Sequence, residues 1–314
     1  MDARLQYLTT SDNLKLYYEL WMPDKPKAVV VFVHGLGDHL GRYASFAKFL
    51  IANGYGVCLY DQRGHGRSTG RRMHCRSFGD YLKDLSQVIE LVQDIRPNAP
   101  LFLAGHSFGG QVAINFVTKY SKGLRGVVAL SPNIEPLVAI PGWKKKFALK
   151  LSAVIPIVKF KSWVDPKDFS HDLQVVERAK ADPLMHWHVT ARLGAEILKN
   201  LDGIKMQAFQ VKIPALFMHG GDDKITSIEA TRKFYHHLLV QNKDLKTYPG
   251  MYHELLNESG REKIYHDIDV WINGQLEAYS RLARSGGEEG YEKKNNLNLW
   301  HNSRTDFGMH GRAI

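Results

Sequence analysis

Residues 101–110 read L-F-L-A-G-H-S-F-G-G, an apolar run that leads into a serine with a glycine two positions away on each side. Leu101 to Ala104 is expected to form a strand, and Phe108 to Tyr120 a helix. A serine at such a strand-to-helix turn adopts a strained backbone conformation, and the two glycines let neighbouring backbone approach it. The turn would therefore expose the Ser107 hydroxyl at the end of the strand, where the helix N-terminus favours negative charge.

Strand-like and helix-like segments alternate on both sides of this turn. Strands are expected at 5–10, 14–22, 28–33, 56–60, 101–104, 127–130, 215–218 and 245–248, and helices at 43–53, 80–95, 108–120, 228–239 and 263–282. Ser11-Asp12-Asn13 predicts a hairpin between the first two strands. The apolar run at 28–33 is typical of a strand that is buried on both faces. The pattern predicts an α/β fold, with a mostly parallel central sheet and helices on both faces.

The alternation stops after Ser131-Pro132 and resumes at Ala215. The residues between follow one another as helical segments without a convincing strand. We therefore expect a first part of the core at 1–132, an inserted helical cap at 133–212 and a second part of the core at 213–282. The remaining residues, 283–314, are rich in glycine and asparagine and show no apolar period, which predicts a flexible tail.

A serine hydroxyl is a weak nucleophile and needs a histidine base, which an acid in turn orients. After the insertion, two loops follow predicted strands and would lie at the same edge of the sheet as Ser107. H-G-G-D-D supplies Asp222 and Asp223, and Y-P-G-M-Y-H-E supplies His253. We expect His253 to be the base, with His219 as its rival. Spacing from the strand does not decide between the two aspartates.

Acyl transfer also needs backbone N–H groups around the developing oxyanion, and each contributes about 10²–10³ in rate. One of them belongs to the residue after the nucleophile, which is Phe108. The other is expected from the loop after the third strand, where H-G-L-G-D-H at 34–39 makes Leu36 the candidate. Taken by itself, this stretch is also compatible with a plain tight turn.

The 314 residues carry a formal net charge of +10, and the positive charge is clustered. Six lysines and no acid lie between 143 and 161, and five arginines and no acid lie between 62 and 79. Nucleic acid, an anionic membrane surface, an acidic substrate or solubility alone would each account for such clusters. With 44% apolar and 24% charged residues, the composition excludes disordered, collagen-like and coiled-coil chains.

The sequence also indicates where the protein works. The longest apolar run, at 28–33, is far shorter than the roughly 18–20 residues of a membrane span. The N-terminus lacks the features of a secretory signal. Cys58 and Cys75 form neither a disulfide framework nor a metal-ligand spacing. We therefore expect a cytoplasmic protein without a bound metal.

Five motifs in this order resemble the α/β-hydrolases, and within them the monoacylglycerol lipase and lysophospholipase branch. They are H-G-L-G-D-H-L-G-R-Y (34–43), D-Q-R-G-H-G-R-S (61–68), G-H-S-F-G-G (105–110), D-P-L (182–184) and G-M-Y-H-E-L-L-N-E (250–258). The resemblance extends from Leu5 to about Trp271. It departs from the family at Asp38, where glutamate is usual, and at Phe108, where methionine is usual. The tail after Leu282 has no counterpart.

The resemblance implies an α/β-hydrolase fold and a serine hydrolase that uses Ser107, Asp223 and His253. In this family the acid is the second of the two positions, which selects Asp223. The backbone N–H groups of Leu36 and Phe108 would form the oxyanion hole. The implied substrate is the ester of a single-chain lipid, such as a monoacylglycerol or a lysophospholipid, and neither a metal nor an organic cofactor is implied.

Residues 133–212 resemble the family's cap, which covers the active site and supplies the acyl channel. As a helix, W-K-K-K-F-A-L-K-L-S-A-V would be amphipathic. Its lysines, each worth about 1 kcal/mol near anionic lipid, predict a peripheral membrane contact through Lys144, Lys145, Lys146 and Lys150. Alternatively, Phe147, Leu151 and Val154 pack on the core and the lysines face water.

Other readings of the sequence remain. A broad carboxylesterase or an acyltransferase on short or soluble esters is the nearest one. A non-catalytic lipid-binding protein would predict a damaged triad, which the sequence does not show. Nucleic-acid binding is not expected, because neither basic cluster falls in a recognised motif. We expect a structural role for D-Q-R-G-H-G-R-S, with His65 packed inside the protein. Head group, acyl length and oligomeric state do not follow from the sequence.

Overall fold

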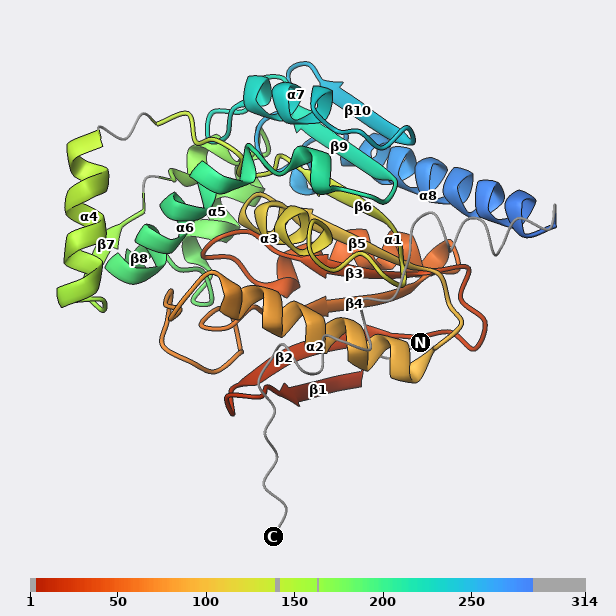
Figure 1. Ribbon diagram of the computed structural model, residues 1–314, viewed down its shortest axis with the longest axis horizontal. Helices are drawn as coiled ribbons and strands as arrows, with labels where there is room; N and C mark the ends of the chain where they lie inside the picture. The colour runs from red at the N-terminus through yellow and green to blue at the C-terminus, as the bar shows by residue number, and fades with distance from the viewer. Residues whose placement is uncertain (1–3, 139–141, 163, 285–314) are drawn as a thin grey trace, which may run out of the picture.

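An eight-stranded sheet runs through the middle of the molecule (Figure 1), in a computed structural model that describes residues 4–138, 142–162 and 164–284. Only the backbone is described at 4, 5, 143–145, 147 and 282–284. The predicted flexible tail lies outside the described residues from 285 onward. The strands of the sheet are β1 (Arg4–Thr9), β2 (Lys15–Trp21), β3 (Val29–Val33), β4 (Gly56–Tyr60), β5 (Leu101–His106), β6 (Leu124–Leu130), β9 (Ala215–Gly220) and β10 (Lys243–Tyr248).

The strand order is β1-β2-β4-β3-β5-β6-β9-β10. β2 pairs antiparallel with both β1 and β4, and every other pair in the sheet is parallel. The predicted hairpin joins β1 to β2, with Asn13 in the left-handed region at φ 63°. The expectation of a mostly parallel sheet is confirmed. Because parallel strands end at the same edge, the loops after β3, β5, β6, β9 and β10 meet there.

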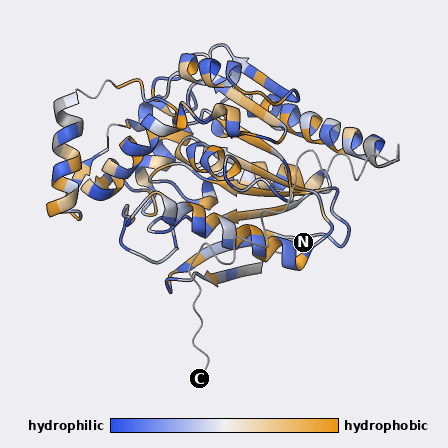
Figure 2. Ribbon diagram, viewed as in Figure 1, coloured by the Kyte–Doolittle hydropathy of each residue, from blue (hydrophilic) through white to orange (hydrophobic). Residues whose placement is uncertain are grey.

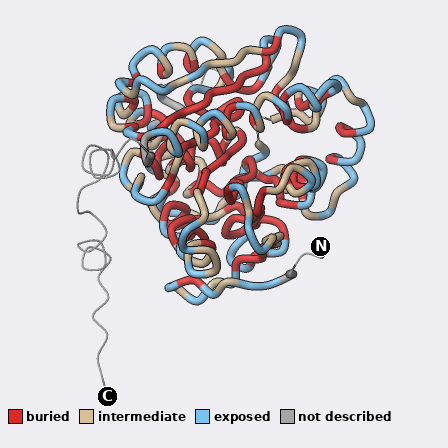
Figure 3. Tube along the Cα trace, turned by 90° about the vertical axis from the view of Figure 1, so that its right-hand side faces the viewer, coloured by how far each residue is buried: buried red, intermediate tan, exposed pale blue. Residues whose placement is uncertain are grey.

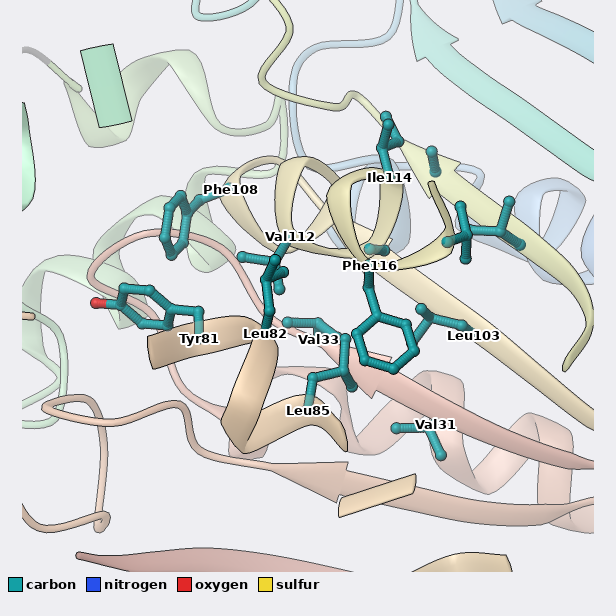
Figure 4. Close-up of a cluster of buried hydrophobic side chains, with 14 of the residues drawn as sticks. Val31, Val33, Tyr81, Leu82, Leu85, Leu103, Phe108, Val112, Ile114 and Phe116 are labelled. Carbon is teal, nitrogen blue, oxygen red and sulfur yellow. The ribbon is translucent and has the colours of Figure 1, made fainter. Parts of the chain in front are cut away.

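Helices cover both faces of the sheet, as predicted. The helices of the core are α1 (Ala44–Ala52), α2 (Gly79–Ile95), α3 (Phe108–Val117), α7 (Ile228–His236) and α8 (Arg261–Arg284), with the short 3₁₀ turns η1 (Leu40–Tyr43) and η4 (Leu255–Asn257). Side chains of α2, α3 and α7 pack in one apolar cluster, part of which Figure 4 shows, and those of α1 and α8 pack in a second.

The sequence of β3 explains how one strand serves both clusters. All five residues of V-V-V-F-V are buried. Val29, Val31 and Val33 belong to the first cluster, while Val30 and Phe32 belong to the second, because successive side chains point to opposite faces of a strand. Each such side chain contributes about 1.5–3 kcal/mol when fully buried. In Figure 2, apolar residues concentrate on the central strands. In Figure 3, the residues coloured as buried gather inside the molecule.

Residues 133–212, called the inserted segment below, connect β6 to β9, which are neighbours in the sheet. Its elements are α4 (Gly142–Val154), β7 (Lys159–Lys161), η2 (Pro166–Asp168), α5 (Leu173–Ala181), β8 (His188–Thr190), α6 (Ala191–Ile204) and η3 (Ala208–Gln210). The expectation that this segment lacks strands was wrong, because β7 and β8 form an antiparallel pair. Three residues are too few to leave an alternating pattern in the sequence.

The helix α4 of the inserted segment lies at the left edge of Figure 1, at the end of the molecule away from the sheet. Val154, at its end, is 79% exposed, so the alternative in which this residue packs on the core was wrong.

Across the part of the chain that the structure describes, no helix has both the length and the apolar character that crossing a membrane requires.

Candidate active site

Ser107 occupies the turn between β5 and α3. Its backbone angles, φ 54° and ψ −117°, are strained for a residue with a side chain, as the glycine spacing predicts. Its N–H donates to the carbonyl of Leu130 at 2.9 Å. Its own carbonyl accepts from the N–H groups of Gln111 and Asn133, both at 3.0 Å. These bonds from three segments hold the strained residue in place.

The two glycines that flank Ser107 are required by close backbone contacts. A Cβ at Gly105 would lie 2.4 Å from the carbonyl oxygen of Gly109. A Cβ at Gly109 would lie 2.1 Å from the carbonyl oxygen of Val33 in β3. Both distances are shorter than any real contact of a Cβ with oxygen, so only glycine fits at either position. The strand and the helix can therefore approach each other closely at this turn.

Asp223 and His253 come together from the loops after β9 and β10. His253 Nδ1 lies 2.8 Å from Asp223 Oδ2, while Asp223 Oδ1 accepts from the N–H groups of Ile225 and Thr226 at 2.7 and 3.0 Å. A carboxylate only accepts hydrogen bonds, so in the neutral ring of His253 the proton is on Nδ1 and the lone pair is on Nε2. That arrangement suits a general base.

The Asp223 carboxylate is ionised. Burial alone would raise its pKa, but the charges and hydrogen bonds of His253 and His219 outweigh burial and hold the pKa of Asp223 well below its usual range. A negative charge at this point favours a positive charge on the histidine ring beside it. Asp223 can therefore stabilise His253 after that residue has taken a proton.

The rival candidates lie in different surroundings. His219 Nε2 is 3.0 Å from the same Asp223 oxygen, but its Nδ1 is 3.0 Å from the Thr231 hydroxyl and the residue is fully buried. With both ring nitrogens engaged, His219 has no lone pair to offer a serine. Asp222 is exposed, and its N–H donates to the carbonyl of Met251 at 3.0 Å. The structure thus brings Asp223, and not Asp222, to His253.

The loop of His253 packs against the end of β5, directly before Ser107. The rings of His106 and His253 lie 4.8 Å apart between centroids, and His106 Nε2 lies 3.2 Å from the His253 carbonyl oxygen. The Thr226 hydroxyl of the Asp223 loop reaches the Ser131 carbonyl at 3.3 Å. Ser107, Asp223 and His253 therefore belong to loops that contact one another at one edge of the sheet.

The loop after β3 reaches the same place. A Cβ at Gly35 would lie 3.6 Å from Cβ of Ser107. Among the residues that the structure describes, neither the N–H of Leu36 nor that of Phe108 donates a hydrogen bond. The Phe108 side chain points away and packs edge-to-face on Tyr81, with 5.0 Å between ring centroids (Figure 4). Two backbone donors thus remain available beside Ser107, as an oxyanion hole requires.

One ion-pair cluster had no role in the sequence analysis. Arg42 donates to both carboxylate oxygens of Glu254, at 2.7 and 2.6 Å, and lies 3.4 Å from Asp38. Burial alone would raise the pKa of Asp38, but Arg42 foremost outweighs burial and lowers it to about 2. Glu254 directly follows His253, so Arg42 ties the loop of Leu36 to the loop of the candidate base. The sequence signal for this pair was the presence of Arg42 in the motif at 34–43 and of Glu254 in the motif at 250–258.

The inserted segment meets the same loop at two points. His39 Nε2 lies 2.9 Å from Asp182 Oδ2, which belongs to the D-P-L motif. The N–H of His186 donates to the carbonyl of Gly37 at 2.8 Å. Since Gly37 follows Leu36 directly, contacts from the inserted segment fix the backbone on one side of a candidate oxyanion donor.

D-Q-R-G-H-G-R-S has the structural role expected of it. Asp61 accepts from the N–H groups of Leu40 and Arg67, both at 2.7 Å, and so braces the turn. His65 is fully buried and bonds to the Arg63 carbonyl through Nδ1 at 2.9 Å. Burial, foremost, lowers the pKa of His65 to about 3, so its ring is neutral. Across the described residues, no group of three or more His, Cys, Asp or Glu side chains could hold a metal ion.

Comparison with known proteins gives concordant findings. The family model described as "Serine aminopeptidase, S33" matches residues 24–260. The chain is 30% identical over 276 residues to the monoacylglycerol lipase of Mycolicibacterium smegmatis, which covers 84% of this chain and 95% of that protein. It is similar to the crystal structure of the Paleococcus ferrophilus monoacylglycerol lipase, with a TM-score of 0.76 and 31% identity over 83% of this chain and 99% of that one.

A third relative is much longer than this chain. The chain is 33% identical over 280 residues, or 88% of its length, to an uncharacterized abhydrolase domain-containing protein of Dictyostelium discoideum. The match spans 30% of that protein. The same kind of sequence thus occurs both as nearly a whole protein and as one portion of a larger one.

Proposed function

This chain belongs to the serine aminopeptidase S33 family, in the monoacylglycerol lipase branch of the α/β-hydrolases, and on that premise we propose how it acts as a carboxylic ester hydrolase on lipid. The proposed substrate is the ester of a single-chain lipid, such as a monoacylglycerol or a lysophospholipid. The observation that carries the proposal is the 2.8 Å contact of His253 with Asp223 in a loop packed beside the strained Ser107 turn.

The proposed reaction begins with proton transfer. Ser107 Oγ attacks the ester carbonyl while Nε2 of His253 takes its proton. The Asp223 carboxylate stabilises the resulting imidazolium and keeps the ring in the tautomer that exposes Nε2. This assignment is supported by the position of Asp223 Oδ2 on Nδ1 and by the depressed pKa of Asp223.

The N–H groups of Leu36 and Phe108 would donate to the tetrahedral oxyanion. The intermediate collapses with cleavage of the ester bond, and the alcohol leaves with the proton that His253 returns. Water then attacks the acyl-enzyme, again with His253 as base, and releases the fatty acid and free Ser107. Neither step requires a group from outside the chain other than water.

We propose that the inserted segment is the cap of this enzyme and lines the acyl site. The core would then comprise 1–132 and 213–282, with 133–212 as the cap and 283–314 as the tail. The hydrogen bonds of Asp182 with His39 and of His186 with Gly37 support this division, because they join the segment to the loop of Leu36.

We also propose peripheral contact with anionic membrane through one surface of the cap. Of the four predicted lysines, Lys146 and Lys150 are exposed, while the side chains of Lys144 and Lys145 lie outside the described residues. The proposed contact region, called the lysine-apolar patch, comprises exposed residues of α4, β7 and the connection between them. They are Lys150, Lys159 and Lys161 together with Val154, Ile155, Ile157 and Phe160, whose exposures are 79, 45, 46 and 44%. Apolar side chains beside lysines are typical of interfacial binding.

A cytoplasmic location is proposed on chemical grounds. Cys58 and Cys75 are both free and buried. A secreted protein of this kind would gain from disulfides, whereas thiols stay reduced in the cytosol. The proposal agrees with a role at the inner face of a membrane.

Labelling and hydrolysis test the function together. Wild-type protein should react with a fluorophosphonate probe and release oleate from 1-monooleoylglycerol. Ser107→Ala should abolish labelling and lower kcat by at least about 10⁴-fold, because it removes the nucleophile. Ser45→Ala, on the exposed start of α1, is the control and should match wild type. Turnover by pure Ser107→Ala protein would contradict the assignment.

The same assay separates the substrate classes. A panel of 1-monooleoylglycerol, lysophosphatidylcholine and p-nitrophenyl butyrate should show higher kcat/KM on the long-chain lipids. Higher kcat/KM on the short ester would indicate a broad carboxylesterase instead. Absence of hydrolysis on all three would indicate a non-catalytic lipid-binding protein.

A further inference from the structure

Carboxamide side chains connect the helix after Ser107 to α6 of the inserted segment. Asn200 Oδ1 in α6 accepts from Gln111 Nε2 at 2.7 Å and from Asn115 Nδ2 at 3.0 Å, both in α3. Asn200 Nδ2 in return donates to Asn115 Oδ1 at 2.7 Å. Gln111 Oε1 accepts from Asn133 Nδ2 at 2.9 Å. These four side chains are called the amide network below.

The amide network ends at the backbone of Ser107. The N–H of Asn133 and the N–H of Gln111 both donate to the Ser107 carbonyl at 3.0 Å. Asn133 has its side chain held by Gln111, and Gln111 is held in turn by Asn200. A continuous path of hydrogen bonds therefore runs from a helix of the inserted segment to the residue with φ 54°.

Packing alone does not explain these polar residues. Gln111 and Asn115 are 0 and 1% exposed, and every other residue of α3 is buried as well. Leu193, Ile197 and Leu201 of α6 belong to the same apolar cluster as α3, so apolar side chains would suit this contact. A buried amide costs stability unless its donors and acceptors are paired. The amide network meets that condition only when α3 and α6 are in register.

We infer that Asn200 and Gln111 are positioning residues for the nucleophile, an inference that rests on the proposed role of Ser107. They fix the Ser107 carbonyl through Asn133, and with it the peptide plane that carries the N–H of Phe108. Strained backbone persists only where the surrounding contacts determine it. The inserted segment would thus influence the reactivity of Ser107 through α6 and Asn133.

Asn200→Leu tests the inference, because it removes all three hydrogen bonds while keeping the branched side chain and its number of heavy atoms. We expect the second-order rate constant for fluorophosphonate labelling, and kcat on p-nitrophenyl butyrate, to fall about tenfold, since small misplacement of reacting groups costs up to about 10²-fold. KM should stay within about twofold, because no substrate contact is lost. A soluble ester is used so that membrane contact does not enter the measurement.

Two further variants separate positioning from stability. Asn200→Asp keeps an oxygen that accepts from Gln111 and Asn115 but cannot donate to Asn115, and we expect labelling only about threefold slower than in wild type. Leu201→Ala, the next residue of α6, lowers the melting temperature without touching the amide network. It should label within about twofold of wild type. If Asn200→Leu yields no folded protein, Asn200→Asp still must label more slowly than wild type.

The outcomes divide cleanly. Wild-type labelling by Asn200→Leu, or an equal loss in Leu201→Ala, would overturn the inference, because the amide network would then matter only as packing. A wild-type protein that does not label at all would overturn the proposed function instead. Slow labelling confined to the Asn200 variants, with KM preserved, supports the inference.

Discussion

The two neighbouring aspartates after β9 have different surroundings, and that difference predicts different mutational effects. Asp223→Asn removes the charge that stabilises protonated His253 and the acceptor that fixes its tautomer. We expect kcat on p-nitrophenyl butyrate to fall by about 10³–10⁴-fold. Asp222→Asn is the matched control, because Asp222 is exposed, and it should retain wild-type kcat. Equal loss in both variants would show that the loop as a whole, and not the carboxylate, is what matters.

Buried neutral histidines predict how stability depends on pH. Burial, foremost, lowers the pKa of both His65 and His106 to about 3, whereas an unfolded histidine titrates near 6.5. Between these values the unfolded chain binds protons that the folded chain does not, so stability falls as pH decreases from about 6.5. Each histidine contributes a slope of about 1.4 kcal/mol per pH unit, and two give about 2–3 kcal/mol per unit near pH 5.

Urea unfolding at pH 7 and pH 5 checks this slope. His65→Asn removes one of the two protons, and its free energy of unfolding should change less between the two pH values than that of wild type. His236, exposed on α7, supplies the control, and His236→Asn should leave the slope unaltered. A free energy of unfolding that is equal at pH 5 and pH 7 in wild type would contradict the prediction.

At this scale, sequence patterns anticipate residues whose role follows from local chain geometry. The glycines around Ser107 predict its strained turn, because the contact distances leave no room for a Cβ. The choice between Asp222 and Asp223 is different. Neighbouring residues in a loop can point one to the surface and the other to the interior, and their spacing from the strand does not predict which does so. The Arg42–Glu254 pair spans 212 positions and emerges only when two loops fold together.

At the scale of elements, α3 and α6 carry glycines with opposite requirements. Gly109→Ala would place a Cβ 2.1 Å from the Val33 carbonyl and force α3 away from β3. We expect a loss of at least about 3 kcal/mol in the free energy of unfolding, or no folded protein. Gly194 lies within α6 with nothing within 4 Å of its virtual Cβ, so Gly194→Ala should gain about 0.5–1 kcal/mol.

Thermal and urea unfolding of the two alanine variants measure this contrast. Both substitutions add one methyl group to a helix, so helix propensity alone predicts a gain in each. A gain in Gly109→Ala would mean that the close approach of β3 and α3 does not constrain this turn. A loss in Gly194→Ala would mean that α6 needs glycine for a contact not seen in the structure.

Element prediction succeeded where periodicity is long and failed where elements are short. The strands and helices of the core follow from apolar runs and helical spacing, and all of them form. β7 and β8 each contain three residues. They pair because the chain returns at His188–Thr190 to lie beside Lys159–Lys161, and no local sequence pattern predicts that return. The amide network also escaped prediction, because glutamine and asparagine in an apolar helix acquire meaning only from Asn200 on another helix.

At the scale of the whole molecule, the structure distinguishes the two basic clusters that contribute to the net charge of +10. Two of the five arginines in the arginine cluster form ion pairs, Arg63 with Asp84 at 2.6 Å and Arg76 with Asp12 at 2.7 Å. Among the described residues, no carboxylate lies within ion-pair distance of Lys150, Lys159 or Lys161 in the lysine-apolar patch. Unpaired charge beside exposed apolar side chains is what an anionic lipid surface attracts.

This distribution predicts where charge reversal alters lipid binding. Lys150→Glu/Lys159→Glu/Lys161→Glu should weaken binding to vesicles of phosphatidylcholine with 30% phosphatidylserine by about 10²-fold or more, at about 1 kcal/mol for each lysine lost. Hydrolysis of p-nitrophenyl butyrate should be unchanged, because none of the contacts described for Ser107, Asp223 and His253 involves these lysines. Sedimentation of the protein with vesicles measures the first quantity, and a colorimetric assay the second.

A charge-matched variant distinguishes binding through the lysine-apolar patch from binding through the net charge of the whole molecule. Lys48→Glu/Lys119→Glu/Lys233→Glu alters exposed lysines in α1, in the turn after α3 and in α7, and lowers the net charge by the same amount. If the lysine-apolar patch docks on lipid, this control should bind vesicles much as wild type does, whereas Val154→Ser/Ile157→Ser should bind more weakly even without phosphatidylserine. Equal weakening in both charge-reversal variants would mean that the net charge of the molecule drives vesicle binding. It would contradict a specific membrane contact through the lysine-apolar patch.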